Sequence, residues 1–153
     1  MATAGSARRS RVMPAALGMI SARRRCVPAT ILAALARLIG MWIMIAGPYR
    51  AGAPSPAAQA ANLKTLNEAA VALHRAGHVP IIGVNMVLPM IDAAGGTSAA
   101  YDELMAPVSL ALVERCDACL RIGGLSSGAD DEVRLFQANG RPVYRCLADV
   151  PVP

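Results

Sequence analysis

Aromatic side chains are scarce in this chain of 153 residues. They make up 3% of it, as one Trp, one Phe and three Tyr. Proteins that bind single-stranded nucleic acids stack the bases on such rings, so this scarcity argues against a nucleic-acid partner. Hydrophobic residues nevertheless reach 55%, and Ala, Val, Leu and Ile must therefore fill the core. Such a core is typical of a parallel β-sheet covered by alanine-rich helices.

Acidic residues are absent from positions 1–40, which hold seven arginines. Residues 41–153 hold the other eight basic residues and all ten acidic ones, so their formal charge is −2 and the net charge of +5 arises in the first 40 residues. The charge of the whole chain therefore does not indicate nucleic-acid binding by the second part. We divide the chain into a basic, weakly ordered extension, residues 1–40, and a single domain, residues 41–153.

The basic extension has three interpretations. It is rich in arginine and contains serine, which fits a transit-type presequence. The mostly apolar run 27–46 also fits a membrane helix, but Arg37 near its middle would cost roughly 2.5–3.5 kcal/mol. That helix would also use up the segment WIMIA, which the domain needs as a strand. In the third interpretation, which we favour, Met41 is the working start, and the protein is cytoplasmic with no membrane partner.

Complete metal and cofactor motifs are absent from the sequence. Cys116 and Cys119 form a C-x-x-C, but no second cysteine pair and no paired histidines complete a zinc site. This pair is expected to close a helix and enter a strand, whereas a redox pair opens a helix, so we predict reduced cysteines. No stretch matches G-x-G-x-x-G or a Walker loop ending in Gly-Lys-Ser/Thr. We therefore predict neither a metal nor a cofactor.

Strand-like and helical patterns alternate along the second part. Apolar runs predict strands over 42–46, 78–84, 118–122 and 142–147, and helical periodicity predicts helices over 56–75, 99–115 and 130–139. Residues 85–97 are predicted to form a loop because they contain Pro89 and two glycines, and Pro107 is expected to break or kink the middle helix. The alternation predicts an α/β fold, a Rossmann-like or flavodoxin-like three-layer sandwich with a mainly parallel sheet of four to five strands.

Three loops lie where ligands of parallel sheets bind, beyond the carboxyl ends of the strands: AGPYRAG, GVNMVLP and GGLSSGADDE. In the first, Arg50 suits a phosphate because its guanidinium offers paired donors, although it equally fits an exposed turn. Tyr49 beside it either contacts a ligand or packs over the strand ends. In the second loop, Asn85 is placed to hydrogen-bond a ligand. His78, at the strand entrance, is either a ligand contact or a structural hydrogen bonder.

The stretch IGGLSSGADDEV, residues 122–133, raises the question of a catalytic carboxylate. Ser126 or Ser127 can cap the helix that follows, and three acids in its first turns suit the helix dipole. Helix-start chemistry therefore explains acids here in general, without choosing among them. It does not explain why serine and glycine lie beside free backbone N–H groups, an arrangement suited to an anion.

Four segments, IAGPYR, GHVPI, CDACLRI and SSGADDEV, resemble the nucleoside 2-deoxyribosyltransferase superfamily in their order and spacing. This superfamily includes the 2'-deoxynucleoside 5'-phosphate N-hydrolases and an uncharacterised bacterial branch. The resemblance covers about residues 42–147 and none of the extension. Its most specific part is S-x-G-x-x-x-E, which Ser126, Gly128 and Glu132 match position for position.

The resemblance implies roles for individual residues. In the N-hydrolases the serine of this motif contacts the 5'-phosphate and the glutamate is the nucleophile, which implies these roles for Ser126 and Glu132. Arg50 matches an arginine of the first phosphate-binding loop. Transferases that act on unphosphorylated nucleosides typically have aspartate where Ser126 stands, so this serine favours a nucleotide substrate.

The sequence also departs from this family. The relatives carry an aspartate that assists the leaving base where this chain has Ser109, and Asp102 and Asp92 are the possible substitutes. The relatives also follow the nucleophile with Leu-Gly, where this chain has Val133 and Arg134. The predicted catalytic residues are Glu132 and Asp102. The predicted substrate-binding residues are Gly47, Tyr49, Arg50, His78, Asn85, Ser126, Ser127 and Gly128.

The function that follows is an N-glycosidase or deoxyribosyltransferase acting on (deoxy)nucleoside 5'-monophosphates, with a glutamate nucleophile and a covalent glycosyl-enzyme intermediate. The alternative, motivated by Ser109, is a non-catalytic nucleotide-binding or sensing module of the same fold. A Nudix-type pyrophosphatase ranks last because no R-E-x-x-E-E array is present. Glu132 must be ionised to attack; the helix start favours that form, and the neighbouring Asp130 and Asp131 oppose it. By resemblance, we expect a homo-oligomer.

Overall fold

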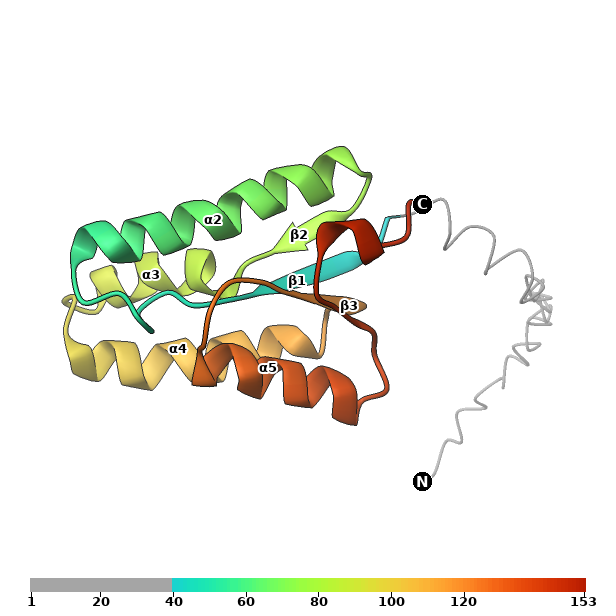
Figure 1. The fold of residues 1–153 in the computed structure, drawn as a ribbon. Helices are drawn as coiled ribbons and strands as arrows, with labels where there is room; N and C mark the ends of the chain where they lie inside the picture. The colour runs from blue at the N-terminus through green and yellow to red at the C-terminus, as the bar shows by residue number, and fades with distance from the viewer. Residues whose placement is uncertain (1–39) are drawn as a thin grey trace, which may run out of the picture.

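The computed structural model describes residues 40–153, which form a four-stranded, all-parallel sheet with helices on both faces (Figure 1). Apart from Gly40, the predicted extension lies outside the described residues, and so do its interpretations. The strands are β1 (Trp42–Ala46), β2 (Val79–Ile81), β3 (Ala118–Arg121) and β4 (Val143–Tyr144). The helices are α2 (Pro56–Arg75), α3 (Gly83–Ala93), α4 (Ser98–Val113), α5 (Ser127–Ala138) and the short 3₁₀ helix η1 (Leu147–Asp149). The predicted α/β class is confirmed.

The two faces of the sheet follow from the alternation of side chains along β1. Ile43 and Ile45 point to one face, where they pack with Leu66 and Leu73 of α2. Met44 and Ala46 point to the other face, in the cluster that also holds Phe136 of α5 and Val113 of α4. Four of the five β1 residues, 43–46, are buried, which fits a continuous apolar run in a strand covered on both faces. Figure 1 shows the resulting layers, with α2 on one side of the sheet and α4 and α5 on the other.

The segment after β2 corrects one prediction. Residues 85–97 were expected to be a loop, but Gly83–Ala93 is a helix that contains Pro89. Val87 and Ile91, one turn apart, are buried against Ala100 of α4, and this packing decides the structure. Pro89 lies on the exposed side of the helix, where water can satisfy the carbonyl that its missing N–H leaves unpaired.

Other boundaries differ in detail from the predicted ones. α4 runs unbroken across Pro107, which is also exposed. α5 begins at Ser127, three residues before the predicted start, because Ser126 caps it: its hydroxyl oxygen accepts a hydrogen bond from the Ala129 N–H at 3.3 Å. β2 and β4 are shorter than the predicted strands 78–84 and 142–147.

The membrane-helix interpretation of residues 27–46, which was not the favoured one, conflicts with the structure at its end. Its last five residues, Trp42–Ala46, are strand β1 in the middle of the sheet. Among residues 40–153, no helix has the length and apolar character needed to cross a membrane.

The strand order, β2-β1-β3-β4, creates a crevice between β1 and β3. From β1 the chain passes through α2 to β2 on one side of β1, and from β3 it passes through α5 to β4 on the other side. The loops after β1 and β3 therefore leave the sheet in opposite directions, and open α/β sheets bind ligands at such a point.

Candidate functional site

A cavity of about 560 Å³ lies at the carboxyl ends of β1 and β3. Its volume is in the range of small-molecule sites. The loop after β1, α4 and the start of α5 contribute most of its lining. The predicted site residues that line it are Gly47, Tyr49, Arg50, Asp102, Ser126, Ser127, Gly128 and Glu132. The structure thus brings together residues from sequence positions more than 80 apart.

The loop after β1 is packed too tightly for a larger residue at Gly47. A Cβ atom there would lie 2.6 Å from Leu66 Cδ2 and 2.9 Å from the Ile122 carbonyl oxygen. The loop after β3 approaches it equally closely, because a Cβ on Gly123 would lie 2.8 Å from Pro48 Cδ. Gly123 also has a φ of 76°, which glycine adopts readily. The two loops therefore form one packed wall beside the cavity.

Arg50 is held over an aromatic ring that the sequence analysis did not identify. Its guanidinium carbon lies 3.5 Å from the centroid of the Tyr101 ring on α4. Such cation–π contacts restrain an arginine while leaving its N–H donors available for a ligand. The Tyr49 carbonyl oxygen accepts a hydrogen bond from Asn62 Nδ2 at 3.0 Å, which ties the same loop to α2.

The start of α5 forms the opposite part of the lining. The Ser126 hydroxyl satisfies one first-turn N–H, and Ser127 and Gly128 follow it at the cavity. A Cβ added to Gly128 would meet no heavy atom within 4 Å, so the backbone there is open to a ligand. Backbone N–H groups and the positive end of the helix dipole favour an anion at this place.

Glu132 lies one turn further along α5, and its carboxylate accepts a hydrogen bond from the Ser109 hydroxyl of α4. Burial raises the pKa of Glu132, while the Ser109 hydrogen bond and the nearby Arg121 charge lower it. Burial, and not the neighbouring Asp130 and Asp131, is the main cause that raises the pKa of Glu132. Each of these aspartates has its own cation, because Asp130 pairs with Arg121 and Asp131 pairs with Arg134.

Ser109 occupies a position where space is limited. It is 6% exposed, and a Cβ added to Gly83 at the start of α3 would lie 2.3 Å from its hydroxyl oxygen. Gly83 and Ser109 therefore fit together as a pair, and both line the cavity. Ser109 thus contacts the predicted nucleophile directly. Asp102, the predicted substitute, lines the cavity from α4 with an exposed side chain.

His78 and Asn85, two of the predicted substrate contacts, do not line this cavity. His78 is 3% exposed; its Nδ1 accepts from the Met41 N–H at 3.2 Å, so Nε2 donates to the Pro151 carbonyl oxygen at 2.9 Å. The alternative of a structural hydrogen bonder therefore holds for it. Asn85, in the first turn of α3, instead donates from Nδ2 to Asn67 Oδ1 of α2 at 2.6 Å.

The cysteines of CDAC are both buried. Burial raises the pKa of Cys116 to about 11 and that of Cys119 to about 12. Cys116 follows α4 and Cys119 lies in β3, as predicted, and both are free. Within residues 40–153, no three His, Cys, Asp or Glu side chains gather as metal ligands would.

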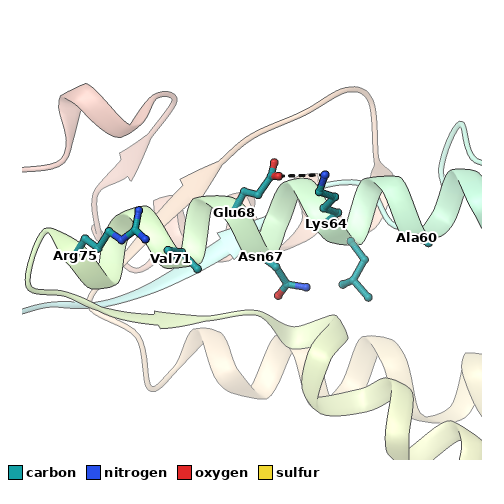
Figure 2. A pocket seen from close by; sticks show the side chains of 7 residues that line it. Ala60, Lys64, Asn67, Glu68, Val71 and Arg75 are labelled. Carbon is teal, nitrogen blue, oxygen red and sulfur yellow. Dashed lines mark ion pairs between the residues drawn. The ribbon is translucent and has the colours of Figure 1, made fainter.

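A second hollow, along the outer face of α2, lacks the features of a reaction site. Figure 2 shows its lining side chains, all from this one helix, with Lys64 and Glu68 paired at 3.6 Å on the surface. Its lining residues all belong to α2, whereas several elements line the cavity between β1 and β3. We therefore take the latter as the candidate site. No protein-family model matches the chain, and no curated protein matches it.

Proposed function

We propose that this chain cleaves the N-glycosidic bond of (deoxy)nucleoside 5'-monophosphates, as a hydrolase or as a deoxyribosyltransferase, with Glu132 as the nucleophile. The proposal depends on one observation, that Glu132 shares a cavity with an arginine and an uncrowded helix start. The arginine is Arg50 and the helix start is Ser126–Gly128. A phosphate suits these two features, and a carboxylate beside them suits the sugar.

The chemistry follows from the position of the carboxylate. An oxygen of Glu132 attacks the anomeric carbon while the bond from that carbon to the base nitrogen breaks. The bonding electrons leave with the base, which takes up a proton. Water or a second base then attacks the same carbon, and the bond to the Glu132 oxygen breaks to restore the carboxylate.

We assign the protonation of the leaving base to Asp102, which lines the same cavity. Ser109 is committed to Glu132 by its hydrogen bond. The lining also contains Asp131, but that carboxylate is paired with Arg134. General acid catalysis of this kind contributes about 10²–10⁴ in rate. Asp102→Asn should therefore slow the release of poor leaving bases most.

The experiment that tests the proposal is a base-release assay. The full chain is incubated with a panel of (deoxy)nucleoside 5'-monophosphates, and free base is measured by chromatography. We expect release that falls by at least about 10³-fold in Glu132→Gln, because the nucleophile is lost. Glu103→Gln is the matched control, because Glu103 is an exposed carboxylate on α4 outside the cavity, and it should leave the rate unchanged.

Calorimetry with the same nucleotides separates the alternative function. Gly128→Ala adds a methyl group at the cavity without an internal clash, so it should keep the fold and weaken nucleotide binding by about tenfold. Binding that weakens in this variant, with no base released from any nucleotide, would establish the non-catalytic binding or sensing module instead. If nucleotides neither bind to the protein nor lose their base, both functions are rejected.

A further inference from the structure

Arg121 is a buried cation that the sequence analysis assigned no role. It is the last residue of β3, and it is 7% exposed. Along β3, Ala118 and Leu120 belong to the cluster that packs on α2, while Cys119 belongs to the cluster on the α4 and α5 face. By the same alternation, Arg121 points to the face on which α5 begins.

The guanidinium of Arg121 contacts the segment that leads into α5 at three places. Nη1 donates to the Ile122 carbonyl oxygen at 2.5 Å, and Nη2 donates to the Gly124 carbonyl oxygen at 2.7 Å. Nε donates to Asp130 Oδ1 in the first turn of α5, at 3.1 Å. One planar group therefore joins the end of β3, the loop after it and the helix start.

Fold stability does not explain an arginine at this position. The Arg121 charge is buried, whereas the Asp130 side chain is 47% exposed, so the hydration that Arg121 loses is only partly offset by this pair. Lysine has a single ammonium group and does not reproduce the three-way contact of the planar fork. The three hydrogen bonds of Arg121 therefore fix the position of the segment that leads into α5. This segment contains Ser126 and Gly128, which line the cavity.

We propose that Arg121 is the positioning residue of the anion-binding segment: it holds residues 122–130 so that the start of α5 receives a phosphate and Glu132 faces the sugar. This inference rests on the proposed function for the identity of the anion. Arg121 does not line the cavity, so it acts through the loop and through Asp130. Its charge also lowers the pKa of Glu132, against the effect of burial.

The test compares two arginines that make the same kinds of contact. Arg141 also donates to two backbone carbonyls, of Val113 and Cys116, and pairs with Glu114, but it lies outside the cavity. We expect Arg121→Gln to weaken the binding of inorganic phosphate and of nucleotides by at least about tenfold, because the binding groups are misplaced. We expect Arg141→Gln to lower Tm without changing phosphate binding.

The carboxyl of Glu132, followed by ¹³C NMR during a pH titration, gives a readout that needs no ligand. The groups that face it are Ser109 on α4, Cys116 just after α4, and Arg121 and Cys119 on β3. Its midpoint should rise in Arg121→Gln, rise less in Arg121→Lys, which keeps the charge, and stay in place in Arg141→Gln. Phosphate binding should be weakened in Arg121→Lys as well, because the fork is lost.

Two results have distinct meanings. If Arg121→Gln and Arg121→Lys lower only Tm, as Arg141→Gln does, and leave phosphate affinity and the Glu132 midpoint unchanged, the positioning role is overturned. If the unaltered chain binds no phosphate and releases no base, the proposed function fails. A shifted Glu132 midpoint in Arg121→Lys, which keeps the charge, would then still support a positioning role toward that carboxylate.

Discussion

Glu132 is a carboxyl whose environment opposes its own ionisation. Burial raises its pKa, and the Ser109 hydroxyl and the Arg121 guanidinium only partly compensate. A nucleophile must be deprotonated, so the proposed activity should increase as the pH rises through the pKa of this group, above the usual range of a glutamate. The same burial that costs the carboxylate its hydration also removes water that would screen its charge from a developing oxocarbenium ion.

The raised pKa of Glu132 predicts a stability effect of definite sign. A folded-state pKa above the unfolded value means that the native state holds its proton more tightly, so stability is lost as the pH rises through the folded-state pKa. Glu132→Gln should therefore raise Tm by a few degrees at pH 8 and have no effect at pH 3.5, measured by scanning calorimetry. Glu103→Gln should show no such pH-dependent difference, and an equal Tm change at both pH values would contradict the assignment.

The helices α3 and α4 illustrate how packing between elements decides structure that local signals oppose. Both contain a proline, and in both it faces outward while apolar residues one turn apart face the partner helix. At the cavity end of this pair, Gly83 allows the two helices to approach closely enough for Ser109 to reach Glu132. The contact between helices therefore sets the environment of the proposed nucleophile.

This close approach predicts a coupling between two substitutions. Gly83→Ala should destabilise the fold by about 1–3 kcal/mol, because its methyl group would overlap the Ser109 hydroxyl. Ser109→Ala removes that oxygen, so the double variant should recover at least half of the loss, with a coupling energy of about 0.5–2 kcal/mol. Urea unfolding measures all three variants. Gly128→Ala, which meets no neighbour, is the control, and strictly additive losses would refute the overlap.

The side chain of His78 connects the two ends of the described domain through hydrogen bonds. His78 receives the Met41 N–H, just before β1, and donates to the Pro151 carbonyl, just after η1. Figure 1 shows η1 on the same side of the sheet as α2. A single buried imidazole thus closes the domain at the edge opposite the cavity, since His78 immediately precedes β2 while the cavity lies at the carboxyl ends of the strands. The homo-oligomer expected from the resemblance remains a prediction.

His78→Ala should therefore affect the whole domain rather than the reaction. It removes two hydrogen bonds and leaves a buried space, which should cost about 2–4 kcal/mol of unfolding free energy. His74→Ala is the matched control, because His74 is an exposed histidine one turn earlier in the chain, on α2. Thermal unfolding followed by circular dichroism compares the two. A change in nucleotide affinity of folded His78→Ala, with Tm unaltered, would return this residue to the ligand contacts.

Local patterns determine much of this protein. The buried run Trp42–Ala46, the helix Pro56–Arg75 and the serine-glycine start of α5 are all evident from residue order, because periodicity, capping and turn chemistry act between near neighbours. The sheet class follows from the alternation of these elements. The gathering of Arg50, Ser126 and Glu132 was predictable too, because parallel strands place the loops at their carboxyl ends on one edge.

Only the tertiary structure decided the features that depend on contact between distant segments. Most of the loop predicted at 85–97 is helix α3, because α4 covers its apolar side, and the two nitrogens of His78 bond Met41 and Pro151 outside the cavity. An arginine at the end of an apolar strand, Arg121, was visible in the sequence, but its partners were not. Burial raises the pKa of Glu132. Burial depends on how distant segments pack together, so the residues near Glu132 in the sequence could not predict this shift.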